Sequence, residues 1–161
     1  MRIIAGRFRS RTLEAPGGLA TRPTSDRLRE TLFNVLAPRI EGARLLDLYA
    51  GSGAVGIEAI SRGASFCWFA EREPKAVAAI RSNVAALKVQ GGYAIEDRSV
   101  GKLMHAMVKN GHAADVVFLD PPYEAVDEYK ATLDFLAVNA GVMLAEGVQE
   151  SRGAGQRTRA F

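Results

Sequence analysis

The chain has 161 residues, of which 48% are hydrophobic and 24% charged, and its formal net charge is +3 at pH 7. These values fit one ordinary globular domain with a single core. No apolar segment reaches the roughly 18 residues of a membrane span, and the N-terminus lacks the apolar stretch of a signal peptide, so we expect a soluble cytoplasmic protein.

The elements expected at the N-terminal end are a hairpin and a helix. Residues 2–8 and 10–16 are expected to form two short strands, and a helix follows over residues 24–36 with Thr24 or Ser25 as its N-cap. The apolar side chains that recur at helical spacing in this helix are Leu28, Leu32, Val35 and Leu36.

Strands and helices alternate over the rest of the chain. Strands are predicted over residues 44–49, 65–71, 92–97, 114–120 and 141–147, the last with a possible continuation to 148. Helices are predicted between them over residues 54–63, 73–88, 99–111 and 127–139. Such alternation is typical of right-handed βαβ units. We therefore predict an α/β fold: a Rossmann-like, doubly wound, mostly parallel sheet with helices on both faces and an N-terminal hairpin and helix appended.

Basic residues are concentrated at the two ends of the chain. Residues 1–40 hold eight arginines and three acidic residues, and residues 151–161 hold three arginines and no acid, so the segment between them is acidic. Arginine suits bidentate contact with phosphate, which favours a polyanionic partner such as nucleic acid. A solvated charged surface is the alternative explanation.

The chain offers little for redox or metal chemistry. Its one cysteine, Cys67, lies in an apolar run, which excludes a disulfide within the monomer and indicates a buried thiol. The two histidines, His105 and His112, have no partners at ligand spacing, so no metal site is expected.

A glycine motif follows the first predicted strand. In DLYAGSGAVG, residues 47–56, Gly51, Gly53 and Gly56 have the G-x-G-x-x-G spacing that allows a tight turn and the close approach of a ligand. Glu71 follows Gly51 by 20 residues and ends the second strand, where its carboxylate can accept hydrogen bonds from both hydroxyls of a ribose. Together they predict a cofactor of the adenosine type.

Two further acids belong to strands of the same sheet. A carboxylate at Asp47 repels the pyrophosphate of NAD and attracts the ammonium and sulfonium groups of S-adenosylmethionine, so it favours the methyl donor. Asp97 ends the third strand and can accept a hydrogen bond from the adenine amino group. Each also has a structural alternative, because Asp47 can cap the helix that follows it and Asp97 can be the N-cap of the next helix.

The fourth strand ends in D-P-P-Y, residues 120–123. Pro121 and Pro122 stiffen the turn and remove backbone donors that compete with a substrate amine. The carboxylate of Asp120 and the carbonyl of Pro121 can accept the two N–H bonds of a planar amine, which leaves its lone pair facing the methyl carbon. Tyr123 offers a ring face on which a flipped-out base can stack. We therefore predict that these four residues form the catalytic site.

These motifs resemble a known family. DLYAGSGAVGIEAISRGA with DPPY is similar to class I S-adenosylmethionine-dependent methyltransferases that modify exocyclic amines. RIIAGRFRSRTL followed by RPTSDRLRETLFNVL resembles the N-terminal signature of the bacterial 16S rRNA guanine-N2 methyltransferases, and the resemblance extends from residue 2 to about residue 146. It implies methyl transfer to the N2 amine of a guanine in 16S rRNA, in the small ribosomal subunit or an assembly intermediate.

The resemblance also implies roles for single residues. Asp47, Gly51 and Gly53 would hold the methionine part of S-adenosylmethionine, Glu71 the ribose and Asp97 the adenine, and the neighbouring Tyr49 is included among the cofactor-binding residues. The guanine would be held by Asp120, Pro121 and Tyr123. The domain organisation expected on this basis is a basic appendage over 1–40, a methyltransferase domain over 41–150 and a basic, disordered tail over 151–161.

The N-terminal arginines are candidates for contact with rRNA. Arg7, Arg9 and Arg11 alternate in the predicted hairpin and so would share one face. Arg22 and Thr24 stand just before the helix, within reach of the active site. An ordinary exposed strand face is the alternative for the first three.

The C-terminal end departs from the family pattern. A fifth strand is normally followed by an antiparallel pair of strands, whereas ESRGAGQRTRAF has no alternating apolar run. We therefore expect incomplete C-terminal strands, an uncovered sheet edge, and a monomer or weak dimer.

Three other functions remain open. An NAD-dependent oxidoreductase would explain the glycine motif but not D-P-P-Y. A DNA adenine or protein glutamine methyltransferase would use the same amine clamp, and a chain without turnover would be a binding module.

Overall fold

The computed structural model describes residues 1–16 and 26–152. Some predictions lie outside the described residues, namely the N-cap at Thr24 or Ser25, the substrate contacts of Arg22 and Thr24, and residues 153–161 of the basic tail. None of the helices within the two described ranges is long and apolar enough to cross a membrane.

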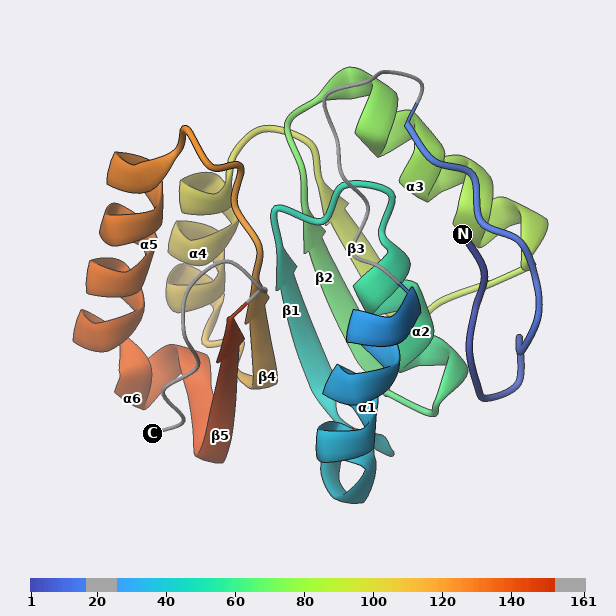
Figure 1. Ribbon diagram of the computed structural model, residues 1–161. Coiled ribbons are helices and arrows are strands. Elements are labelled where there is room, and N and C mark those ends of the chain that lie inside the picture. The colour runs from blue at the N-terminus through green and yellow to red at the C-terminus, as the bar shows by residue number, and fades with distance from the viewer. Residues whose placement is uncertain (17–25, 153–161) are drawn as a thin grey trace.

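Five parallel strands form the sheet (Figure 1). They are β1 (Arg44–Leu48), β2 (Phe66–Ala70), β3 (Tyr93–Glu96), β4 (Ala114–Leu119) and β5 (Leu144–Arg152), and their order across the sheet is β3-β2-β1-β4-β5. All four neighbouring pairs are parallel. The strand order reverses between β1 and β4, which is where ligands bind in sheets of this kind. The predicted Rossmann-like α/β fold is confirmed.

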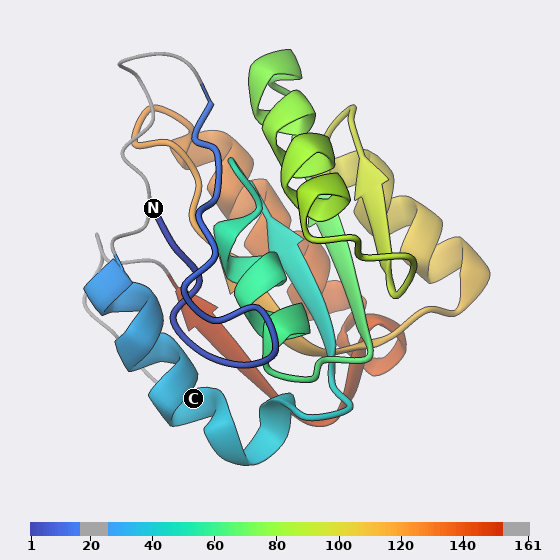
Figure 2. The ribbon, with the colours of Figure 1, turned by 90° about the vertical axis from the view of Figure 1, so that its right-hand side faces the viewer.

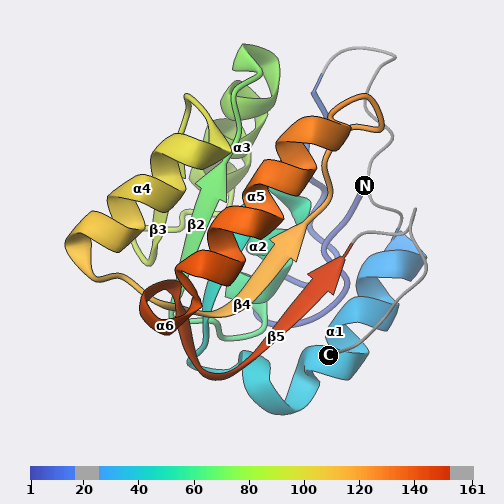
Figure 3. The ribbon, with the colours of Figure 1, turned by 90° about the vertical axis from the view of Figure 1, so that its left-hand side faces the viewer.

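Helices cover both faces of the sheet. One face carries α1 (Asp26–Ile40), α2 (Ala54–Ser61) and α3 (Pro74–Ala86), which lie in front in Figure 2. The other face carries α4 (Val100–Asn110), α5 (Val126–Val138) and the short α6 (Ala140–Met143), as Figure 3 shows. Side chains of the strands alternate between two cores, so that Leu45 packs with the first group of helices and Leu46 with the second.

Helix α1 buries a stripe that matches the predicted one only in part, since Leu36 is buried and Leu28 and Leu32 are half-buried. Val35, expected in the stripe, is 65% exposed. The side chains that α1 buries are Arg29, Phe33, Leu36 and Ile40. A hydropathy pattern does not count an arginine as a core residue, so it could not identify Arg29 as a buried position of this helix. Arg29 is accommodated because its guanidinium donates to a carboxylate oxygen of Asp26 and, at 2.7 Å, to the carbonyl of Arg2.

The predicted N-terminal hairpin is present only as a short antiparallel pairing, and its two regular strands do not form. One antiparallel bridge, between Arg2 and Thr12, and the backbone hydrogen bonds on either side of it join the two halves of this segment, whereas residues 5–10 form turns and bends. Gly6 and Ser10 have φ values of 82° and 67°, which a regular strand does not allow. Alternation therefore gives no common face to the arginines of this segment.

The N-terminal segment instead docks on α2 through a buried carboxylate. Glu58 is fully buried and accepts hydrogen bonds from the backbone N–H groups of Ile4 and Ala5, at 2.8 and 3.0 Å, and from Arg62 Nε at 2.8 Å. A Cβ added to Gly6 would lie 1.9 Å from the carbonyl oxygen of Ser61, so only glycine fits there. The segment is thus part of the main fold.

The last strand begins later and ends later than predicted. Residues 140–143 form α6, whose Met143 is buried against the second core, and β5 starts at Leu144. Strand β5 pairs with β4 as far as Arg152, which is two residues into the predicted tail. It forms one edge of the five-stranded sheet.

Candidate active site

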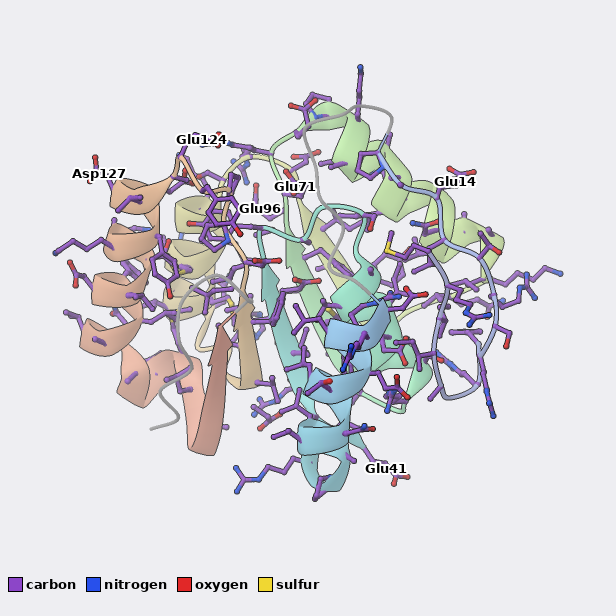
Figure 4. The ribbon with its side chains drawn as sticks, viewed as in Figure 1. Glu14, Glu41, Glu71, Glu96, Glu124 and Asp127 are labelled. Atoms are coloured by element: carbon purple, nitrogen blue, oxygen red, sulfur yellow. The ribbon has the colours of Figure 1, made fainter. Side chains whose placement is uncertain are left out.

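The glycine turn and the D-P-P-Y turn leave the same edge of the sheet from adjacent strands. Leu48 of β1 pairs with Leu119 of β4, so Tyr49 and Asp120 are the next residues on each side. Glu71 and Glu124 lie at this end in Figure 4, and Glu41 lies at the opposite end. The two turns therefore converge at one edge of the sheet.

The glycine turn is built from left-handed backbone positions. Gly51 and Gly53 have φ values of 56° and 76°, and Gly53 is the N-cap of α2. A Cβ on Gly56 would lie 2.3 Å from Cε1 of Phe69 and 2.5 Å from Sγ of Cys67. Glycine at this third position therefore lets α2 pack directly on β2, which brings the N-terminus of the helix to the sheet edge.

Asp47 is buried beneath the turn. Its side chain is 1% exposed, and Oδ2 accepts a hydrogen bond from the N–H of Gly56 at 3.0 Å, so the helix-capping role is confirmed. Burial raises the pKa of Asp47 to about 7; the Gly56 hydrogen bond lowers this pKa, and the negative charges of Asp120 and Glu71 raise it. Three carboxylates are thus electrostatically linked at this edge, while the cofactor-binding role of Asp47 stays a prediction.

Glu71 fixes the shape of the glycine turn. Its two carboxylate oxygens accept hydrogen bonds from the N–H of Gly51 and the N–H of Glu73, both at 2.8 Å. Each carboxylate oxygen can accept more than one hydrogen bond, so ribose hydroxyls can add to these bonds. Glu71, the residue predicted to bind the ribose, is thus hydrogen-bonded to the glycine turn.

Tyr49 faces away from the glycine turn. Its φ of 64° is unusual for a residue with a side chain and directs the ring to the α5 face, where the hydroxyl lies 2.9 Å from Oγ1 of Thr132. Burial is the largest cause that raises the pKa of Tyr49. This geometry does not support a contact between the Tyr49 side chain and the cofactor, so that contact stays a prediction. The backbone of Tyr49 nevertheless sets the direction of the turn.

Asp97 lies at the same end of the sheet but has an ion-pair partner. Its Oδ2 is 2.9 Å from Nη2 of Arg81, and both side chains are at least half exposed. The structural alternative is wrong, because the N-cap of α4 is Ser99, whose hydroxyl accepts from the N–H of Lys102. A contact with adenine stays a prediction.

The D-P-P-Y turn presents an aromatic ring to the solvent. Asp120 and Pro121 are half-buried, whereas Tyr123 is 78% exposed. The turn is closed by a hydrogen bond of 3.0 Å from the N–H of Ala125 to the carbonyl of Pro122. An exposed ring beside a half-buried carboxylate has the features that the predicted base clamp requires.

Comparison with known proteins places the chain in a family. Residues 1–149 match the family described as Conserved hypothetical protein 95. The chain belongs to this family. A relative from Bacillus subtilis named "Putative rRNA methyltransferase YlbH" is 38% identical over 139 residues, which cover 81% of this chain and 76% of the relative.

Two proteins from Escherichia coli extend the comparison. "Ribosomal RNA small subunit methyltransferase D" is 40% identical over 123 residues, which cover 76% of this chain and 60% of that protein's length. The solved structure "Putative methyltransferase yhhF" from the same organism superposes with a TM-score of 0.79 at 35% identity, over 93% of this chain and 78% of that one. The fold and the family are thus shown together.

The N-terminal arginines of this family member point outward without a shared strand face. Arg7, Arg9 and Arg11 are all exposed. Arg7 lies over the ring of Phe8 at 4.5 Å, and Nη2 of Arg11 is 3.4 Å from the carbonyl of Ala86. Their contact with rRNA stays a prediction.

Two buried polar residues near the site were missed by sequence reasoning. Glu58 on α2 and Asn83 on α3 are 0% and 2% exposed. Each is a polar residue within an otherwise apolar helical pattern, and that exception was the available signal. Within residues 1–16 and 26–152, no group of three His, Cys, Asp or Glu side chains is arranged to hold a metal ion.

Proposed function

We propose that the chain transfers a methyl group from S-adenosylmethionine to the exocyclic N2 amine of a guanine in the 16S rRNA of the small ribosomal subunit. The observation that carries this proposal is the emergence of the glycine turn and the D-P-P-Y turn side by side, after Leu48 and Leu119. One turn has the features of a nucleoside-cofactor loop and the other those of an amine clamp.

The residues at this edge fit a cationic cofactor better than an anionic one. The carboxylate of Asp47 is buried, and the negative charges of Asp120 and Glu71 act on it. A positive group would relieve this repulsion, whereas a pyrophosphate would add to it. S-adenosylmethionine carries a sulfonium and an ammonium group, so the acid set favours it over NAD.

Each residue has a defined role in the transfer. The Glu71 carboxylate would hold the ribose, and Asp97 would accept from the adenine amine. The Asp120 carboxylate and the Pro121 carbonyl would accept the two N–H bonds of the guanine amine, which aims its lone pair at the methyl carbon. The exposed ring of Tyr123 would stack on the flipped-out base.

The transfer balances without a metal or a redox partner. When bound, S-adenosylmethionine supplies a methyl carbon whose bond electrons leave with sulfur as the new N–C bond forms. The amine loses one proton after the transfer, when its acidity has risen, so no strong general base is required of Asp120.

The rRNA assignment rests on the relatives and on the basic N-terminal segment. Relatives named as rRNA methyltransferases share 38% and 40% identity with the chain. The exposed Arg7, Arg9 and Arg11 supply positive charge on a segment that docks on α2. Bidentate contact of such residues with phosphates would orient the RNA.

Two assays test this proposal. In a thermal-shift assay, S-adenosylhomocysteine should raise the melting temperature and NADH should not; the reverse result refutes the cofactor assignment. In a labelling assay with tritiated methyl donor, small subunits, free rRNA, DNA and a release factor are compared side by side. Label is expected in the small subunit or its rRNA, and label found only in DNA or protein refutes the substrate assignment.

A further inference from the structure

We propose that Asn83 is a positioning residue that couples the N-terminal segment to the glycine turn, so that donor binding and rRNA binding strengthen each other. This inference rests on the proposed function, because it assigns the donor to the turn and the rRNA to the N-terminal segment. Asn83 lies on α3, outside both the turn and the segment, and its side chain bonds to each of them.

The side-chain amide of Asn83 joins two segments that are far apart in the sequence. Its Oδ1 accepts from the N–H of Glu14 at 2.7 Å, and its Nδ2 donates to the carbonyl of Glu14 and to the carbonyl of Ser52, both at 3.1 Å. Glu14 belongs to the N-terminal segment, and Ser52 stands between the two left-handed glycines of the turn. The Asn83 side chain thus fixes the position of the N-terminal segment relative to the glycine turn.

Only an amide satisfies this set of partners. The N–H of Glu14 needs an acceptor, while the two carbonyls need donors, and the asparagine side chain offers both in one plane. The side chain is 2% exposed, so water has little access to replace a lost hydrogen bond. Ser52 is also reached directly by the segment, since its Oγ lies 3.9 Å from Sδ of Met1.

The glycine turn is therefore held from two sides by adjacent residues. Glu71, the predicted ribose acid, accepts from the N–H of Gly51, and Asn83 donates to the carbonyl of the next residue, Ser52. A donor that orders the turn would also order Glu14 through Asn83. By thermodynamic linkage, an RNA that orders the N-terminal segment would then raise the affinity for the donor by the same factor.

Ser61 provides a matched control at the other end of the segment. Its Oγ donates to the carbonyl of Ala5 at 2.6 Å and accepts from the N–H of Phe8 at 3.0 Å. Ser61→Ala thus removes hydrogen bonds to the same segment, but at residues 5 and 8 rather than at Glu14 and the turn. If Asn83 only helped to hold the segment, the two variants would behave alike.

The first experiment needs no variant. Hydrogen exchange of single amides is followed with and without saturating S-adenosylhomocysteine. Exchange at Glu14 should slow by about 3-fold or more beyond any change at Phe8, whose N–H bonds to Ser61. Equal changes at both amides, with S-adenosylhomocysteine bound, would overturn the inference and leave the proposed function intact; absence of binding would count against the proposed function itself.

The second experiment measures the coupling. The dissociation constant of S-adenosylhomocysteine is determined with and without saturating small subunits for the wild type, Asn83→Ala and Ser61→Ala. We expect the subunit to raise the affinity for S-adenosylhomocysteine about 5-fold or more in the wild type and in Ser61→Ala. In Asn83→Ala the subunit should leave this affinity unchanged. Unchanged coupling in Asn83→Ala, or equal loss in both variants, would overturn the inference. If Asn83→Ala does not fold, the exchange experiment decides.

Discussion

Replacing Asp47 by asparagine should make the folded chain more stable at alkaline pH while it weakens binding of the methyl donor. The carboxylate is 1% exposed and is retained beneath the glycine turn against its own desolvation. Asparagine keeps an oxygen that can accept from the N–H of Gly56, as Oδ2 of Asp47 does now. The substitution therefore removes the charge and preserves the cap of α2.

The size of the effect follows from the pKa of Asp47. Burial raises this pKa from 3.8 to about 7 in the folded chain, and each pH unit between two such values corresponds to about 1.4 kcal/mol. The folded chain binds this proton more tightly than the unfolded chain, so the stability contributed by Asp47 declines as the pH rises from about 4 to about 7. Relative to a side chain that is always neutral, Asp47 destabilises the fold by about 4 kcal/mol at pH 8, where it is ionised when folded, and by about 2 kcal/mol at pH 5.5, where it must take up a proton on folding.

Urea unfolding at the two pH values measures this prediction. Burial removes water from the amide hydrogens of the new asparagine. This desolvation offsets about 1 to 2 kcal/mol of the gain in unfolding free energy at both pH values. The advantage of Asp47→Asn over the wild type should still grow by about 2 kcal/mol from pH 5.5 to pH 8. Affinity for S-adenosylmethionine should fall about 10-fold or more at pH 8, because a cation loses one carboxylate partner.

Asp115 supplies a control of opposite sign. The side-chain hydrogen bond from Arg44, at 3.0 Å, is the largest cause that lowers the pKa of Asp115, so this acid stabilises the fold when it is ionised. Asp115→Asn should destabilise the chain equally at pH 5.5 and pH 8, since the stability is lost only as the pH falls through the lowered pKa. A stability difference for Asp47→Asn that does not change with pH, or one that favours the wild type at pH 8, would refute the electrostatic reasoning.

Three further substitutions test other parts of the account. Tyr123→Ala should lower methyl transfer about 10- to 100-fold through lost stacking while Tyr123→Phe retains it, and both should melt like the wild type because the side chain is 78% exposed. Gly56→Ala should destabilise the chain by about 1 to 3 kcal/mol in urea, since its Cβ would lie 2.3 Å from Phe69. Glu58→Gln should lower the unfolding free energy by about 2 to 3 kcal/mol, because it breaks the buried pair with Arg62; a wild-type midpoint would show that the N-terminal segment is held otherwise.

The central α/β part of the fold was predictable because its signals are local. Each strand from β1 to β4 is a short apolar run that ends in an acid or a turn, and each of the helices α2, α3 and α4 has its own glycine or proline at an end. Parallel order then follows from the alternation, and the meeting of Gly51 with Asp120 at one edge follows from the order. The convergence of the site was therefore predictable without coordinates.

The ends of the fold were less predictable because their contacts are long-range. The backbone of residues 4 and 5 bonds to Glu58, more than 50 positions away, in place of a hairpin partner. Arg29 is buried through the carbonyl of Arg2, which no local pattern shows. The same reason hid Asn83, whose partners Glu14 and Ser52 are neighbours only in space.

The most direct test of the central claim is to identify the methylated nucleoside and to ask whether its formation requires Asp120. Small subunits labelled by the wild type and by Asp120→Ala are digested to nucleosides and separated, while binding of S-adenosylhomocysteine is measured for both proteins. We expect N2-methylguanosine with the wild type and about 100-fold less with Asp120→Ala, whose S-adenosylhomocysteine binding persists. Label in another nucleoside, or undiminished transfer by Asp120→Ala, would contradict it.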